Sequence, residues 1–531
     1  MPRMPLAAAL FGRFDLRAAV TAELSGRNSL LPRRFDDDVL ARDLDEVVKW
    51  AAPQVRRAAP PTQENVVLAR KGWRGLRPLS VLSLTDRIAY RALVRLLAES
   101  LPDEVRSREA NATFKAAPLQ VAGARYVLQT DVASFFQYVD HEVLGDELLA
   151  QTGEEPAVEA LLALLGGVAG RRVGIPQIST ASDVLGDVYV DPVRRSLARS
   201  GLAVFRYADD FRVACPSLGA ALAALEACDD AVRALGLTLN ERKSLTFSRP
   251  SYQRSLDAFR QREAELFEGD GDADGSDLSA LDSQYGDDPV AGAVDIETVL
   301  GLTGTDPAPL EDGDALAEDA SPEDEDDRLV VRAAARALDL WVEEDEGHDA
   351  QSTQDAAITQ SLLSRALPLL GRAGDSGPLD YVRAILTHEP ALTPQVAEYL
   401  VSLAASDGAS ARSVRDALDD VVEQDVISPW QGMWLAHAAG ALPRTRRPGR
   451  HIDWLESCVR DESPALAATA GMALGRRRRG DPTMLAGSLD RVGPAWRPLL
   501  LLGLALQDWE RASASADGAL DRILLASARP V

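Results

Sequence analysis

Two adjacent aspartates in an apolar setting are the residues of this chain best suited to do chemistry. Asp209 and Asp210 follow an apolar, aromatic run that ends in Tyr207-Ala208, and apolar residues resume at Phe211. Neighbouring carboxylates repel each other and are poorly placed inside a strand, so the pattern predicts a tight β-hairpin turn at which divalent cations neutralise the acids. An exposed turn without chemistry is the alternative, because Asp is common in turns.

A third carboxylate lies upstream of this pair. Asp131 ends an apolar strand predicted over residues 126–131, and an aromatic pair, Phe135-Phe136, follows it. Phosphoryl transfer assisted by two metal ions needs acids from separate strands that converge, with the ions about 4 Å apart. The three aspartates therefore predict a site for two Mg²⁺ ions, with Mn²⁺ as a substitute.

Other segments occur around these aspartates in a defined order. They are Arg77-Pro78-Leu79-Ser80 and Asp86-Arg87, the strand that ends at Asp131, the loop Gly174-Ile175-Pro176-Gln177 with a helix expected after it, the Tyr207-Ala208-Asp209-Asp210 hairpin, and Lys243. In this order and spacing they resemble the fingers and palm of a reverse transcriptase, over roughly residues 70–250.

The resemblance implies a role for each matching residue. Asp131, Asp209 and Asp210 would bind the catalytic metals, with the carbonyl of Val132 as a further ligand. The residues implied to contact the incoming dNTP are Lys115, Ala133, Ser134, Phe135, Phe136, Gln177 and Lys243. Among these, the backbone of residues 133–135 would cradle the triphosphate and Phe136 would crowd the sugar 2′ position, so that deoxynucleotides are preferred. Arg77 is implied to contact nucleic acid.

Two departures from the family pattern bear on mechanism. Ile178 stands where the family has glycine after Pro-Gln, and a branched side chain beside the templating base restricts the approach of a template. After Lys243 there is no Leu-Gly primer-grip strand, so a conventional thumb is not visible. Because of these departures, the alternative remains that the palm binds nucleic acid or a partner protein but is catalytically inactive.

The negative charge of the chain is concentrated in one segment. The formal net charge is −25, and residues 263–327 contain 23 Asp and Glu and no Lys or Arg, so the remainder is close to neutral. The charge therefore does not exclude a nucleic-acid enzyme, which needs cations for phosphates. The acidic segment is too polar to form a core, and we expect a mostly disordered linker.

The chain after this segment predicts helices throughout. Apolar residues recur at helical spacing in residues 329–341, 396–404, 413–422, 430–442, 464–474 and 496–506. Repeated helices without strand signals indicate a HEAT-like solenoid, with a compact helical bundle as the alternative. The expected fold is thus α+β, with right-hand polymerase fingers and palm in residues 1–262, a linker in 263–327 and an all-α repeat domain in 328–531 that replaces or supplements the thumb.

Arginines cluster in this helical region. The clusters are Arg444, Arg446, Arg447 and Arg450, and Arg476, Arg477, Arg478 and Arg479. They predict either a phosphate track for template or product, or arginines that complement helix dipoles at helix ends.

The architecture also resembles the abortive-infection and defence-associated reverse transcriptases of bacteria, which carry a helical-repeat domain. This resemblance implies an antiphage role and, in some relatives, protein-primed, untemplated DNA synthesis. Tyr285, Tyr381 and Tyr399 are the candidate priming residues. Copying of a bound RNA template into a DNA product, and a catalytically inactive nucleic-acid-binding or sensing module, are the alternatives.

Further expectations come from composition. Cys215, Cys228 and Cys458 are too scattered for a disulfide framework or a zinc site, and we expect reduced, buried thiols. The chain shows no convincing signal peptide and no long apolar segment, so the expected location is cytoplasmic, without membrane contact. Helical repeats often pair, and a homo-oligomer formed through them is a further expectation.

Overall fold

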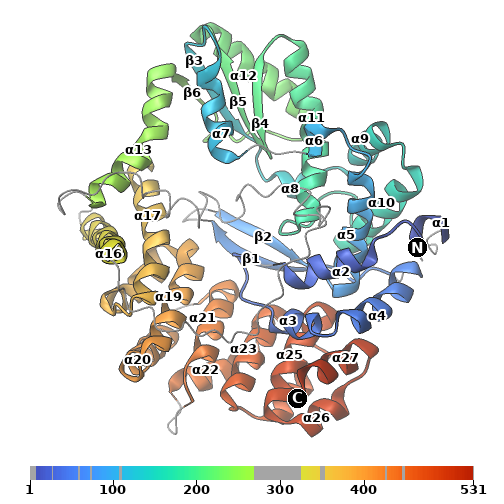
Figure 1. Ribbon diagram of the computed structural model, residues 1–531, viewed down its shortest axis with the longest axis vertical. Coiled ribbons are helices and arrows are strands. Elements are labelled where there is room, and N and C mark those ends of the chain that lie inside the picture. The colour runs from blue at the N-terminus through green and yellow to red at the C-terminus, as the bar shows by residue number, and fades with distance from the viewer. Residues whose placement is uncertain are drawn as a thin grey trace.

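The computed structural model describes residues 8–26, 28–57, 60–71, 75–106, 110–267, 325–346, 353–424, 427–444 and 449–529. A mixed α/β region comes first and an all-helical region follows it (Figure 1). The predicted linker overlaps the described helices at both ends, because α13 (Arg249–Phe267) and α16 (Glu325–Glu346) extend into it. Its other residues lie outside the described part, and the division into domains stays a prediction.

A four-stranded antiparallel sheet forms the predicted palm. The strands lie in the order β4 (Ala203–Tyr207), β5 (Asp210–Cys215), β3 (Tyr126–Asp131) and β6 (Leu245–Ser248). Side chains such as Val127, Leu128 and Val213 are buried, which explains the apolar runs in these strands. The predicted hairpin at Tyr207-Ala208-Asp209-Asp210 is confirmed, since β4 and β5 are joined there by a two-residue loop.

Helices surround the sheet and the fingers. Those of the mixed region are α1 (Ala8–Phe11), α2 (Leu16–Ser25), α3 (Phe35–Ala41), α4 (Leu44–Arg56), α5 (Leu84–Ala98), α6 (Asp103–Arg106), α7 (Asn111–Ala116), η1 (Ala117–Gln120), α8 (Phe135–Tyr138), α9 (His141–Thr152), α10 (Glu155–Ala169), α11 (Thr180–Arg199), α12 (Leu218–Arg233) and α13. Helix α12 packs on β3 and β5, and α11 packs on β4.

The predicted fingers combine a hairpin with a buried helix. Strands β1 (Asn65–Lys71) and β2 (Gly75–Val81) pair in register from Asn65 opposite Val81 to Lys71 opposite Gly75. Helix α5 follows, and the Ser83 hydroxyl caps it by accepting a hydrogen bond from the Asp86 amide. Nearly every side chain of α5 is buried, so this helix is the core of the fingers.

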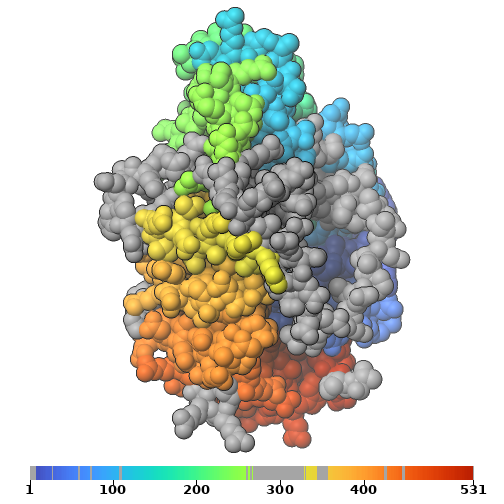
Figure 2. Space-filling model, turned by 60° about the vertical axis from the view of Figure 1, so that its left-hand side comes forward, coloured from blue at the N-terminus to red at the C-terminus, as the bar shows by residue number. Residues whose placement is uncertain are grey.

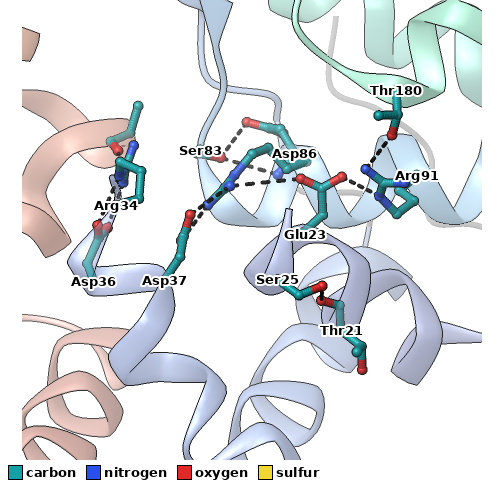
Figure 3. A network of polar contacts seen from close by, with 12 residues as sticks. Thr21, Glu23, Ser25, Arg34, Asp36, Asp37, Ser83, Asp86, Arg91 and Thr180 are labelled. Atoms are coloured by element: carbon teal, nitrogen blue, oxygen red, sulfur yellow. Dashed lines mark hydrogen bonds and ion pairs between the residues drawn. The ribbon is translucent and has the colours of Figure 1, made fainter. Parts of the chain in front are cut away.

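The charged residues of α5 enter a buried network of ion pairs (Figure 3). The Arg87 guanidinium donates to both carboxylate oxygens of Asp37 at 3.0 and 2.8 Å, and it lies 3.8 Å from Glu23. Arg91 donates to Glu23 at 2.5 Å and to the hydroxyl of Thr180, the first residue of α11, at 2.7 Å. The network therefore joins α2, α3 and α5 to the palm helix α11.

The second region is helical over its whole described length, as predicted. Its elements are α16, α17 (Thr353–Arg372), η2 (Gly377–Tyr381), α18 (Val382–His388), η3 (Pro390–Leu392), α19 (Thr393–Ser406), α20 (Gly408–Gln424), α21 (Pro429–Ala441), α22 (Arg450–Val459), α23 (Pro464–Arg477), α24 (Pro482–Ser488), α25 (Gly493–Gln507), α26 (Trp509–Ser515) and α27 (Ala519–Ala528). Helices α16, α17, α19, α21, α23 and α25 pack on one another in series, and Figure 2 shows them as a column in sequence order. A HEAT-like repeat remains a prediction.

The helical region returns to the N-terminal part of the chain. Its α25 and α27 pack on α3, and α21 and α23 pack on β1 (Figure 1). The indole N–H of Trp430 donates to the Leu30 carbonyl at 2.7 Å, and that of Trp496 donates to the Asn65 side chain at 2.8 Å. The Arg34 guanidinium lies 4.6 Å from the centre of the Trp496 ring. The base of the fingers hairpin is thus held by the helical region.

The cysteines and the longer helices bear on the expectations drawn from composition. The three cysteines are free and buried, as predicted. None of the described helices combines the length and the apolar character that crossing a membrane requires.

Replacement of Arg87 by methionine tests the fingers network. Arg87→Met removes the arginine that binds both carboxylate oxygens of the buried Asp37, so we expect a loss of about 3–5 kcal/mol in the free energy of unfolding. Lys49→Met is the control, because Lys49 and Glu46 form an exposed pair at 2.7 Å, and its expected loss is below about 1 kcal/mol. Urea denaturation measures both, and equal losses would contradict the network's role.

Candidate active site

The three predicted acidic residues meet at one end of the palm sheet. The register of β3 and β5 sets Asp131 directly opposite Asp210. Asp209 occupies the hairpin loop, and its carbonyl accepts a hydrogen bond from the Val132 amide at 3.2 Å. Two separate strands therefore deliver carboxylates to one place, as the spacing in the sequence predicts.

Burial and mutual repulsion make this cluster electrostatically unfavourable by itself. Burial, followed by repulsion from Asp131 and Asp210, raises the pKa of Asp209 to about 7. Burial also raises the pKa of Asp210, although the nearby Arg212 opposes this effect. Carboxylates in such a position are stabilised by cations.

Protein cations and an amide already contact the aspartates. The Lys243 ammonium lies 3.1 Å from one oxygen of Asp131, and the Asn240 side-chain amide donates to the other at 3.2 Å. Arg212 lies 3.5 Å from Asp210 and also donates to the Phe211 carbonyl at 3.0 Å. Lys243 was predicted, whereas Asn240 and Arg212 were not, although both lie close to predicted residues in the sequence.

The donor set fits hard divalent cations. Carboxylate and carbonyl oxygens are the ligands that Mg²⁺ and Mn²⁺ prefer, and a cation here would offset the repulsion that raises the pKa of Asp209. Asp131, Asp209, Asp210 and the Val132 carbonyl would hold such ions. In the described part of the chain, no three His, Cys, Asp or Glu side chains form a ready metal cluster, and Asp131 is instead paired with Lys243.

The segment after Asp131 changes direction sharply. Ser134 has φ +50° in the left-handed region and directly precedes α8. The Ala133 amide donates to the Thr238 carbonyl at 2.9 Å. That amide is therefore engaged in the fold, and a triphosphate cradle formed by the backbone of residues 133–135 stays a prediction.

The fingers hairpin contributes a cation that the sequence analysis did not single out. Lys71 ends β1 and is exposed to solvent. Partial desolvation by neighbouring groups and the positive charges of Lys243 and Arg77 lower its pKa, while Asp131 and Asp209 act in the opposite direction. These effects place Lys71 in the electrostatic field of the carboxylates. The signal in the sequence was the basic Arg70-Lys71 pair at the end of the strand.

A family comparison agrees with this geometry. Residues 69–266 match the family model described as reverse transcriptase (RNA-dependent DNA polymerase). These residues form a reverse transcriptase domain. The matched range includes the carboxylate strand β3, the hairpin of β4 and β5, and nearly all of α13.

Comparisons with whole proteins add little to this assignment. A solved structure of telomerase from Candida albicans in complex with a fragment of telomeric RNA is similar to this chain at 12% identity, with a TM-score of 0.30. The similarity covers 67% of this chain and 66% of that one. At this TM-score it carries no argument about function. No curated protein matches the chain.

A cavity lies between the fingers and the palm of the reverse transcriptase domain. It has a volume of about 180 Å³, and its lining includes Phe136, Gln177, Glu64, Ser80 and Arg171. Two predicted dNTP-contacting residues, Phe136 and Gln177, therefore face the same space. Ile178, expected to restrict a template, is half-buried and packs against the core, and its effect on templating stays a prediction.

Helix α7 covers the sheet beside the hairpin of β4 and β5. Its Phe114 is buried and stacks on Tyr207 with ring centres 5.6 Å apart, and the Arg212 guanidinium lies 5.2 Å from the Phe114 ring centre. The Tyr252 hydroxyl of α13 donates to the Lys115 carbonyl at 2.8 Å. Lys115 is thus anchored through its backbone near the hairpin, and a contact of its ammonium with the triphosphate remains a prediction.

The arginine clusters are largely engaged in structural contacts. Arg477 is only 4% exposed and donates to the carbonyls of Leu442 and Pro443, which corrects its assignment to a phosphate track. The Arg476 guanidinium lies 4.6 Å from the Phe35 ring centre. The other contacts are those of Arg444 with the Arg476 carbonyl, Arg450 with Glu423, and Arg478 as the left-handed cap of α23.

These contacts agree with the helix-end alternative for Arg476 and Arg477. Arg446 and Arg447 lie outside the described residues. Nucleic-acid binding by Arg444, Arg450, Arg478 and Arg479 stays a prediction.

The candidate priming tyrosines differ in accessibility. Tyr399 is 0% exposed and its hydroxyl donates to the Asp375 carbonyl at 2.9 Å. A buried, hydrogen-bonded hydroxyl cannot accept a nucleotide without unfolding of α19, so its assignment as a primer is corrected. Tyr381 is half-buried against the core, and Tyr285 lies outside the described residues.

Replacement of Lys71 tests whether the fingers hairpin contacts the bound nucleotide. Lys71→Met removes one charge-assisted contact to a bound triphosphate, and we expect the KM for dNTP to rise by about tenfold with a smaller change in kcat. Steady-state incorporation kinetics measure both constants, with Lys49→Met, at an exposed position of α4, as the control. An unchanged KM would show that Lys71 does not contact the nucleotide.

Proposed function

We propose that this protein is a DNA polymerase of the reverse transcriptase type, which transfers nucleotidyl groups from dNTPs with the help of divalent cations. The observation that carries the proposal is the pairing of β3 and β5, which sets Asp131 opposite Asp210 with Asp209 beside them. A purely structural role gives no reason to place three mutually repelling carboxylates at one end of a sheet. The family match over residues 69–266 supports the same reading.

Each part of the site has a task in this proposal. Bound divalent cations would polarise the α-phosphate and activate the attacking hydroxyl. Asp131, Asp209 and Asp210 would hold these ions, and Lys71 and Lys243 would attract and orient the negatively charged triphosphate. In the structure Lys243 is paired with Asp131 at 3.1 Å, so nucleotide binding would redistribute this ammonium between the carboxylate and the phosphates.

The choice of sugar is assigned to Phe136. This ring packs edge-on against Phe135, with centres 5.2 Å apart, and lines the cavity that Gln177 also lines. A rigid aromatic ring in this place would leave no room for a 2′-hydroxyl, so that deoxynucleotides are the proposed substrates.

A role in antiphage defence, with synthesis primed by the protein itself, is the finer part of the proposal. Its support is the order of a reverse transcriptase domain followed by an all-helical region. Copying of a bound RNA is the alternative mode, and the match to an RNA-dependent polymerase family favours it.

Nucleotide incorporation by the purified protein tests the function. The full chain is incubated with labelled dNTPs and Mg²⁺, without primer or template in one arm and with an RNA template and DNA primer in the other. We expect incorporation in at least one arm and none in either arm for Asp209→Asn or Asp210→Asn, which keep side-chain volume but remove charge. Label on the protein band of a denaturing gel identifies self-priming, and extension of the added primer identifies templated copying.

Failure of incorporation in both arms would contradict the polymerase proposal. It would favour the nucleic-acid-binding module, for which gel-shift binding of RNA and DNA by the same preparation provides the check.

Replacement of Phe136 tests the sugar preference. Phe136→Ala opens space beside the 2′ position, and we expect the ratio of kcat/KM for dNTP to that for rNTP to fall by at least about tenfold. Leu149→Ala on α9, a 42% exposed residue, is the control. An unchanged ratio would mean that another residue selects the sugar.

A further inference from the structure

The catalytic hairpin turns through a backbone conformation that is unfavourable for its residue. Ala208 and Asp209 form the loop between the paired residues Tyr207 and Asp210. Ala208 has φ +49°, in the left-handed region that glycine adopts freely and alanine does not. Such a conformation persists only where the surroundings hold it. The placement of Asp209, the next residue, therefore depends on the contacts that hold Ala208.

Arg206 makes one of these contacts. Its Nη1 donates to the Ala208 carbonyl at 3.3 Å and to Oδ1 of Asp187 at 2.5 Å. The Arg206 side chain is 6% exposed and that of Asp187 is 0% exposed. The buried carboxylate of Asp187 holds the guanidinium at the same nitrogen that contacts the turn, which limits its movement away from the turn.

Asp187 belongs to a firmly packed helix. Its neighbour Gly186 lies so close to Phe135 that a methyl group there would come within 2.9 Å of the ring. The Tyr189 hydroxyl, further along α11, donates to the Leu235 carbonyl at 2.6 Å. Helix α11 thus offers a rigid support from which Arg206 can hold the hairpin.

We propose that Arg206 is a positioning residue of the active site and that Asp187 orients it. This inference rests on the proposed function, because it concerns the same carboxylates. Arg206 holds the peptide that leads into Asp209 from one side, and the Val132 amide holds the Asp209 carbonyl from the other at 3.2 Å. The two contacts together set where Asp209 lies relative to the strand that carries Asp131.

A buried ion pair that serves stability alone is the competing explanation. Removal of Arg206 would take from the buried Asp187 the arginine that pairs with it, and the loss of one partner of a buried ion pair destabilises a fold whatever the role of the arginine. Removal of both charges relieves that penalty but does not restore the contact with the Ala208 carbonyl. The two explanations therefore differ in the activity of the double variant.

Kinetics and thermal stability of four variants test the proposal. They are Arg206→Met, Asp187→Asn, the double variant and, as a control, Arg194→Met, whose arginine pairs with Asp191 on the same helix. We expect the double variant to recover most of the melting temperature lost in Arg206→Met, while its kcat stays about 10²-fold below wild type because Asp209 is misplaced. Its KM for dNTP is expected to stay within about threefold of wild type. Arg194→Met is expected to keep its kcat.

A double variant with wild-type kcat would overturn the positioning role. An Asp187→Asn variant gives a second check: its amide oxygen can still accept from Arg206, so its kcat is expected to exceed that of Arg206→Met. Equal losses in the two single variants would also count against the proposal.

Hydrogen exchange keeps this test separate from the test of the proposed function. The Val132 amide donates to the Asp209 carbonyl, so its exchange reports the position of the turn without any catalysis. We expect faster exchange of this amide in the double variant than in wild type and no change in Arg194→Met. If the wild type incorporates no nucleotide, the proposed function fails, and unchanged exchange in the double variant would then overturn the positioning role independently.

Discussion

Repulsion among three aspartates is the constraint on which the arrangement of this molecule depends. The register of β3 and β5 forces Asp131 and Asp210 to face each other with Asp209 at the turn. Burial, followed by repulsion from the other two carboxylates, raises the pKa of Asp209 to about 7. Positive charge must therefore be brought to this end of the sheet. The chain supplies part of it as Lys243, just before β6, and Lys71 from the fingers hairpin. The oxygen donors that remain suit divalent cations.

The helical region supports the fingers hairpin, which carries one of these cations. It forms a column from α16 to α25 (Figure 2) and ends against the fingers, where Trp496 donates to Asn65 at the first position of β1 and Trp430 donates to the Leu30 carbonyl. The hairpin that carries Lys71 at its other end is therefore braced at its base. A helical region in this position supports the fingers, in addition to any contact it makes with nucleic acid.

Local chemistry was readable from the sequence, and long-range packing was not. Asp131, Asp209 and Asp210 could be identified from their residue type and spacing. The helices of the second region could be predicted from the helical spacing of their apolar residues. The burial of Arg477 and Tyr399 depends on neighbouring helices that no motif specifies. The approach of Lys71 to the carboxylates likewise arises from the packing of the fingers on the palm, which local pattern does not encode.

The most direct test of the account is a structure of the full chain determined with Mn²⁺ and a non-hydrolysable dNTP, using the anomalous signal of manganese to locate the ions. The account predicts manganese bound by Asp131, Asp209 and Asp210, with the triphosphate beside Lys71 and Lys243. Bound nucleotide elsewhere, or an absence of manganese from these carboxylates while Lys243 still pairs with Asp131, would contradict it.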